Sequence, residues 1–244
     1  MRRLFVRLPA ALLLLVGANT VWAFSTGPPV SRTGARALGI YPIEATCTQC
    51  HSSTLNDPSG VLQIIGVPFR ANSGQSYPLK VRLNYLLADT TGASNPLWGF
   101  ELTAVNAADG KGAGTLVASN PGAGPTYPDS LLIKTATSGT FLTSNRQYIE
   151  HSIFSTRLDQ LGPVEWNFNW VAPITGGNKV LFFATGNAAN GNSQTNGDHI
   201  FSAADSTETL GPGVPATTTP TAVAMLLLLV SAGAAAVIVR RRVA

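Results

Sequence analysis

The chain has 244 residues and a formal net charge of +4, but its charges are unevenly distributed. Residues 24–239 hold 10 basic and 12 acidic side chains, which leaves this part with a net charge of −2. A nearly neutral central region excludes the basic patch of a nucleic-acid-binding protein and the polybasic face of a peripheral membrane protein. With only two cysteines, the central region must be stabilised by burial of apolar surface rather than by disulfides.

Residues 1–23 have the pattern of a secretory signal peptide. Three arginines, Arg2, Arg3 and Arg7, accompany a short apolar run, and Val21-Trp22-Ala23 offers a small-residue cleavage site. The apolar run is short for a bilayer span, so we expect cleavage rather than anchoring. The sequence therefore predicts an exported protein.

Residues 24–60 are predicted to form a lead-in without periodicity, and they contain both cysteines in the sequence Cys47-Thr48-Gln49-Cys50-His51. Cys-x-x-Cys-His is the attachment signature of c-type haem. Two thiols at this spacing can each add to a haem vinyl group, and the adjacent histidine then binds the iron. We therefore predict one covalent haem c, held by Cys47 and Cys50, with His51 as an iron ligand.

Two other interpretations of the motif stay open. In an oxidising compartment Cys47 and Cys50 can form a disulfide, although so small a loop adds little stability. Zinc can also bind two cysteines and a histidine, but no second Cys-x-x-Cys or His-x₃-His pair completes such a site.

Residues 61–205 show the period-2 alternation of short strands. The clearest example is 164–170, where Trp166, Phe168 and Trp170 alternate with polar residues and are expected to face a core. The expected strands are 61–69, 77–87, 98–105, 115–118, 131–134, 146–152, 164–170, 179–185 and 198–202, with a Gly/Asn-rich loop over 186–197. Many short strands, regular turn signals and no amphipathic helix predict an all-β, two-sheet β-sandwich.

The C-terminal part has the pattern of a membrane anchor. Residues 206–220 are a Pro/Thr-rich linker, and residues 221–239 are an uncharged stretch that covers about 28 Å as a helix, close to the thickness of a bilayer core. The basic tail 240–244 begins with Arg240, Arg241 and Arg242, which the positive-inside rule places in the cytoplasm. We therefore expect a single transmembrane or sorting helix, with the β domain outside.

Several fragments resemble a known family when they are taken together and in order. They are Gly27-Pro28-Pro29-Val30, Arg32-Thr33-Gly34-Ala35, Cys47-x-x-Cys50-His51, Arg146-Gln147-Tyr148-Ile149-Glu150-His151, Trp166-Asn167-Phe168-x-Trp170-x-Ala172-Pro173, Gly186-Asn187-Ala188-Ala189-Asn190-Gly191 and Gly197-Asp198-His199-Ile200-Phe201. They resemble the bacterial surface domain called choice-of-anchor V, which is distantly similar to the reelin-type (reeler) domain. The resemblance implies an exported, immunoglobulin-like β-sandwich, periplasmic or at the cell surface of a bacterium, and no settled biochemical activity.

The second axial ligand of the haem has few candidates. Residues 24–220 contain no methionine and only two histidines besides His51. We predict His151, since it lies on an expected strand and the matching family segment usually carries a histidine there. His199 lies beside a flexible loop, where a histidine satisfied by neighbouring hydrogen bonds is the simpler interpretation.

Enzyme chemistry is not expected, because no nucleophile elbow, P-loop, dinucleotide fingerprint or His-Glu-x-x-His motif is present. The prediction is therefore a membrane-anchored haem c protein for electron transfer or redox sensing, with a redox partner protein. The alternative is a haem-free surface module for adhesion or partner binding, with Cys47 and Cys50 oxidised.

Overall fold

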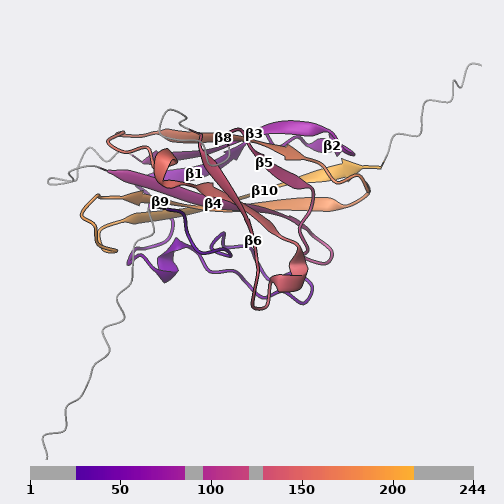
Figure 1. Ribbon diagram of the computed structural model, residues 1–244, viewed down its shortest axis with the longest axis horizontal. Coiled ribbons are helices and arrows are strands. Elements are labelled where there is room, and N and C mark those ends of the chain that lie inside the picture. The colour runs from indigo at the N-terminus through magenta and orange to yellow at the C-terminus, as the bar shows by residue number, and fades with distance from the viewer. Residues whose placement is uncertain (1–25, 86–95, 121–128, 212–244) are drawn as a thin grey trace, which may run out of the picture.

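The structure is a computed structural model that describes residues 26–85, 96–120 and 129–211. Two β-sheets pack face to face, so the predicted all-β, two-sheet architecture is confirmed (Figure 1). The four-stranded sheet has the order β1 (Gly60–Ile65), β3 (Ser76–Tyr85), β8 (Val164–Val171), β5 (Thr115–Ala118). The six-stranded sheet has the order β2 (Arg70–Asn72), β10 (His199–Leu210), β9 (Lys179–Ala189), β4 (Leu97–Asn106), β7 (Gln147–His151), β6 (Leu131–Thr135).

Helical structure in the described residues is limited to short 3₁₀ turns, η1 (Cys47–Gln49), η3 (Leu142–Ser144) and η4 (Ile153–Ser155). No helix in the described ranges is long and apolar enough to cross a membrane. The predicted signal peptide (1–23), the membrane segment (221–239) and the basic tail (240–244) lie outside the described residues.

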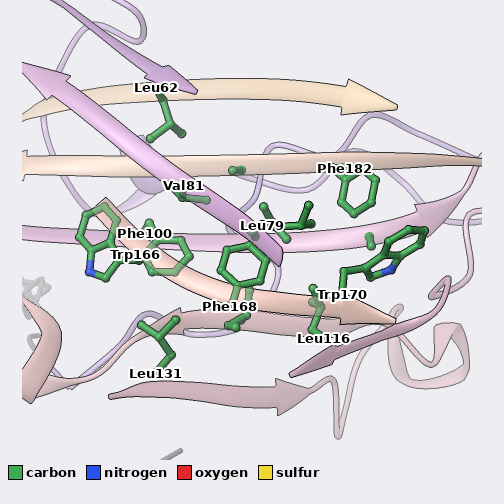
Figure 2. Close-up of a cluster of buried hydrophobic side chains, with 14 of the residues drawn as sticks. Leu62, Leu79, Val81, Phe100, Leu116, Leu131, Trp166, Phe168, Trp170 and Phe182 are labelled. Carbon is green, nitrogen blue, oxygen red and sulfur yellow. The ribbon is translucent and has the colours of Figure 1, made fainter. Parts of the chain in front are cut away.

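The core lies between the two sheets and is rich in aromatic side chains. Trp166, Phe168 and Trp170 of β8 all point inward, as their alternation predicted (Figure 2). The Trp166 ring packs against Phe100 of β4 at a centroid distance of 4.7 Å. Each indole also finds a backbone acceptor, since Trp166 donates to the Ser155 carbonyl at 2.7 Å and Trp170 donates to a carbonyl at 2.9 Å. The aromatic row is therefore interior packing and not an exposed sugar-binding surface.

The segment 61–69, predicted as one strand, is a strand only up to Ile65, and its remainder connects the two sheets. β1 ends at Ile65, and Gly66 follows with a φ of +94°. A Cβ at Gly66 would lie 2.5 Å from the Pro78 carbonyl oxygen, so the position needs glycine. After this turn the chain crosses to the other sheet, where β2 pairs with β10 in the one parallel register of the described strands.

Two other strands are longer than their sequence patterns indicated. β9 continues to Ala189, into the segment predicted as a loop, and β10 continues to Leu210, beyond the predicted domain boundary at residue 205. The two strands pair with each other from Lys179 to Ala188 of β9, so each extension pairs with the predicted part of the other strand. The backbone partner supplies the hydrogen bonds that weakly β-forming residues such as Ala203, Ala204 and Asp205 need.

The lead-in covers the outer face of the six-stranded sheet (Figure 1). The Arg32 N–H donates to Glu101 of β4 at 2.5 Å, and Thr185 of β9 donates to the Arg32 carbonyl. Ala35 packs with Val105, Leu181 and other apolar side chains in a small second core. The two central strands are consequently buried on both faces, and the motif of Cys47 to His51 is placed directly over them.

Candidate functional site

The cysteine motif begins with the short helix η1. Thr46 caps its N-terminus by accepting from the Thr48 N–H at 3.3 Å, and the N–H groups of Cys50 and His51 both donate to the Cys47 carbonyl. Side chains three residues apart eclipse in a 3₁₀ turn, so Cys47 and Cys50 project from the same side. Neither cysteine is bonded to the other, and both are free thiols.

The Cys47 thiol lies against β9. Its Sγ is 3.2 Å from Thr185 Oγ1, and Thr185 in turn donates to the Arg32 carbonyl. Burial raises the pKa of Cys47 to about 12, the Thr185 contact opposes this shift only in part, and the nearby Glu101 carboxylate adds to it. Cys47 is therefore a protonated thiol at neutral pH.

His51 is oriented by a buried carboxylate. Its Nδ1 lies 2.5 Å from Oδ2 of Asp198, whose side chain is 1 % exposed and also accepts from the Asn190 N–H. Since a carboxylate accepts hydrogen bonds, Nδ1 carries the proton and Nε2 keeps a lone pair. The Asn187 amide nitrogen lies 3.4 Å from that Nε2. A carboxylate on one ring nitrogen is the usual arrangement behind a metal-binding histidine.

His151 ends β7 and is also buried. Its Nδ1 is 3.0 Å from the Phe100 nitrogen and 3.2 Å from the Phe100 carbonyl oxygen, so either tautomer finds a partner. The ring occupies the space above Gly99, where an added Cβ would lie 2.5 Å from Cε1. The Phe100 N–H donates to Nδ1, so Nδ1 is the acceptor and the ring proton is on Nε2. Binding a metal through Nε2 would require the other tautomer, with the proton on Nδ1 and donated to the Phe100 carbonyl.

One register pair brings these two histidines to the same place. Asn187 of β9, which contacts His51, is paired with Gly99 of β4, against which the His151 ring packs. Side chains of directly paired residues lie about 5 Å apart, so the two rings contact neighbouring positions of β4 and β9. In the alternation of β7, His151 is on the same side as Ile149, a core residue. The next pair on the same face of β4 and β9 is Thr185 with Glu101, and Thr185 contacts Cys47.

His199 lies elsewhere. It shares the inner side of β10 with Phe201, a core residue, whereas His51 lies over the outer face. Its Nδ1 is 2.7 Å from Asp57, its Nε2 is 2.8 Å from the Tyr85 hydroxyl, and its ring stacks on Tyr85. The environment is that of a histidine satisfied by hydrogen bonds, as the sequence suggested.

A buried acidic pair beside the motif was missed by the sequence reasoning. Glu101 and Glu150 face each other in the register of β4 and β7. Burial raises the pKa of Glu101 well above its usual range, and repulsion from Glu150 adds to this. Burial raises the pKa of Glu150 to about 7, and its ion pair with Lys134 limits the rise. The available signal was a glutamate inside an otherwise apolar run, Phe100-Glu101-Leu102.

Metal binding by protein side chains alone has no further support. Across residues 26–85, 96–120 and 129–211, no three His, Cys, Asp or Glu side chains are placed to share a metal ion. The zinc interpretation of Cys47 and Cys50 lacks the third ligand that it requires.

No protein-family model matches the sequence, and no similar curated protein was found. Among solved structures, the chain is similar to the human F-spondin reeler domain at 14 % identity, covering 64 % of this chain and 95 % of that one, with a TM-score of 0.36. The chain is also similar to a Reelin-N domain of F-spondin at 15 % identity, covering 65 % of this chain and 92 % of that one, with a TM-score of 0.37. A third similar structure is a cohesin module from a Clostridium perfringens family 33 glycoside hydrolase, at 13 % identity. The match covers 63 % of this chain and 98 % of that one, with a TM-score of 0.37. Nothing about function is inferred from values this low.

Proposed function

We propose that this chain is an exported, membrane-anchored, immunoglobulin-like β-sandwich of the reeler or choice-of-anchor V type that carries one haem c for electron transfer or redox sensing. In this proposal Cys47 and Cys50 form the thioether bonds, and His51 and His151 are the two axial ligands. The observation that carries it is the Gly99–Asn187 pair, since Asn187 contacts His51 and Gly99 contacts His151, beside two free cysteines.

The residues present suit the group. The absence of a Cβ on Gly99 lets the His151 ring pack against the backbone there, and the Asn187 side-chain oxygen is buried without a hydrogen-bond partner. The thioether at Cys47 has no proton to donate, and Thr185 keeps the Arg32 carbonyl as its acceptor. Attachment at Cys47 therefore leaves no buried hydroxyl unpaired.

Each residue has a distinct part in the proposal. Asp198 would keep the proton on His51 Nδ1, so that Nε2 could bind the iron. His151 would bind through Nε2 in the tautomer whose Nδ1 donates to the Phe100 carbonyl. When bound, haem supplies an iron that changes between ferrous and ferric states. Two nitrogen ligands, with no thioether ligand from methionine, favour a low reduction potential.

The location and partners belong to the same proposal. The signal peptide delivers the domain outside, the span at residues 221–239 holds it at the membrane, and a redox protein exchanges electrons with it. No nucleic acid partner and no enzyme activity are proposed, because the exported part has no net positive charge and no recognisable catalytic motif.

The test is haem attachment in an exporting host that makes c-type cytochromes. We expect the full chain to stain for haem on a denaturing gel and to gain the mass of one haem on a peptide that contains Cys47 and Cys50. A chain that carries no haem adduct, and whose cysteines instead form a disulfide, contradicts the proposal and favours the haem-free surface module.

A separate set of variants tests whether His151 is the second axial ligand. His151→Ala removes the side chain, and Gly99→Ala displaces the same ring by placing a Cβ against it. We expect both to change the visible spectrum to that of a haem with one histidine lost. His199→Ala, on the opposite face from His51, is the matched control and leaves the spectrum unchanged. An unchanged spectrum in both His151→Ala and Gly99→Ala removes His151 from the site.

A further inference from the structure

The described chain leaves the sandwich at the end of β10, and several other segments meet there (Figure 1). Leu210 pairs with Asn72 of β2, and Glu208 pairs with Lys179 of β9. Ala107, which follows β4, donates its N–H to the Lys179 carbonyl at 2.9 Å. The turn after β4 therefore lies at the same end as the exit of the chain.

A turn of the lead-in and a loop after β8 complete this end. A Cβ on Gly110 would lie 2.5 Å from the Leu38 carbonyl oxygen, so the lead-in turn packs on the turn after β4. Ile174 lies beside the turn at Gly74 that follows β2. We call this surface the exit end and define it by residues 36–43, 69–74, 107–111, 174–179 and 207–211.

The exit end carries the most exposed large apolar side chains of the described domain. Ile40 and Phe69 are each 81 % exposed, Ile174 is 78 % exposed and Ile43 is 69 % exposed. No other large apolar side chain of the described ranges reaches these values. Apolar residues gathered at one end of a domain point to a surface that becomes covered.

The exit end is also more basic than the rest of the domain. Its charged residues are Arg36, Arg70, Lys111, Lys179, Asp109 and Glu208, all exposed. Four basic and two acidic groups give +2, whereas the rest of residues 24–211 holds six basic and 10 acidic groups, or −4. Exposed apolar side chains with basic neighbours suit the interface of an anionic bilayer.

The sequence beyond this point indicates what covers it. Residues 212–220 separate the exit end from the apolar span at residues 221–239. Nine residues reach at most about 30 Å, so the span tethers this end of the sandwich close to the bilayer. We propose that the exit end docks on the outer surface of the membrane, with Phe69, Ile174 and Ile40 entering the interfacial region of the lipid. This inference rests on the proposed membrane anchor and is independent of haem.

Photo-crosslinking to lipid tests the inference on the full chain. p-Benzoylphenylalanine, a photoreactive amino acid, replaces Phe69, Ile174 or Ile40, and the protein is reconstituted in nanodiscs of phosphatidylethanolamine and phosphatidylglycerol. The matched control is position Leu161, which is 66 % exposed and precedes Gly162, a residue packed on Trp98 at the opposite end of β4. We expect a severalfold higher yield of lipid–peptide adducts, measured by mass spectrometry, from the three exit-end positions than from position 161.

A second experiment tests the same docking without the photoreactive amino acid. The double change Phe69→Ser and Ile174→Ser alters only exposed side chains, and we expect hydrogen exchange of residues 69–74 in nanodiscs to become severalfold faster. Adduct yields at the exit end no higher than at position 161, in a chain that resists carbonate extraction, overturn the docking inference alone. A chain released from membranes by carbonate overturns the anchor and the docking together.

Discussion

The two sulfur atoms and the two histidines of the candidate site are each controlled by one or two neighbouring atoms. Cys47 contacts Thr185, His51 contacts Asp198, and His151 contacts the backbone of Phe100. Such contacts fix which nitrogen of a histidine carries a proton and whether a thiol ionises. The chemistry proposed for the site can therefore be tested one atom at a time.

The first residue-scale prediction concerns the reactivity of Cys47 in the folded, haem-free chain. With a pKa of about 12, Cys47 has roughly one thiolate in ten thousand thiols at pH 8. We expect iodoacetamide to leave Cys47 unmodified at pH 8 in the folded chain and to modify it in urea, as followed by peptide mass spectrometry. Equal rates in both conditions would show that the thiol is not enclosed.

A consequence concerns the order of events in the proposed haem protein. Burial keeps Cys47 protonated and in contact with β9 once the lead-in has docked. We therefore expect haem attachment to precede docking of the lead-in.

The second residue-scale prediction concerns Asp198. Its carboxylate accepts a hydrogen bond from His51 Nδ1, which makes the imidazole a stronger electron donor to a bound iron. A stronger electron donor favours the ferric state. Asp198→Asn keeps an oxygen for the Asn190 N–H but weakens that effect, and we expect the midpoint potential of attached haem to rise by about 60 mV, a tenfold change for one electron. Asp57→Asn, at the corresponding contact of His199, is the control. Equal shifts in the two variants contradict a specific role for Asp198.

At the scale of elements, strands β4 and β9 are, like the short β7, buried on both faces. Their inner faces contribute Phe100 and Phe182 to the core, and their outer faces lie under the lead-in. The outer face is where Glu101 and Thr185 pair. A carboxyl group here loses water on every side, which is why its pKa rises.

The element-scale prediction is a pH dependence of stability that depends on Glu101. Its pKa is raised in the folded state, so its contribution to stability is complete below about pH 4.5 and is lost as the pH rises through the folded-state pKa. Each unit of pKa elevation corresponds to about 1.4 kcal/mol. We expect Glu101→Gln to flatten the fall in the free energy of unfolding between about pH 5 and pH 7, measured by urea denaturation.

The control for this prediction is Glu165→Gln, because the Glu165 side chain is 36 % exposed. It should leave the pH dependence of unfolding almost unchanged. The same slope in wild type and in Glu101→Gln would contradict the assignment of the pH dependence to Glu101.

Strand prediction succeeded where alternation was strong and failed where it was weak. The aromatic row of β8 specified its own inward face, because every second side chain of a strand points the same way. The C-terminal half of β10, with Asp205, Thr207 and Glu208, carries no such alternation and is a strand because β9 and β2 pair with it. β1 ends at Ile65, short of the predicted residue 69, because Gly66 closely approaches another strand, which the local sequence does not reveal.

At the scale of the whole molecule, the lead-in is held to the sheet by a buried ion pair. Glu44 and Arg146 lie 2.5 Å apart, both side chains are 0 % exposed, and Glu44 also accepts from Tyr148 and Thr33. Arg146 precedes β7, the strand that ends with His151. The pair therefore joins the segment that carries the cysteines to the strand that carries the second histidine.

The whole-molecule prediction is that removing the Glu44 carboxylate loosens the lead-in from the sheet. Glu44→Ala leaves Arg146 buried without its counter-charge, at a cost of about 3–5 kcal/mol in the free energy of unfolding. We expect urea denaturation to show that cost, and limited proteolysis to cut within the lead-in first. Lys80→Ala is the control, since it breaks an ion pair that is one-third exposed and should cost less than about 1 kcal/mol. Similar costs for the two variants would mean that the lead-in is not held at Glu44.

The amino-acid sequence by itself determined the all-β class, the inward face of β8 and the identity of the motif from Cys47 to His51. These are local properties, because alternation and spacing act within a few residues. Only the tertiary structure decided that the lead-in covers the sheet, that Cys47 is half-buried against β9, and that His151 rather than His199 packs on the strand pair that His51 contacts. Strand order and register join residues about 100 positions apart, and no local pattern encodes which strands become neighbours.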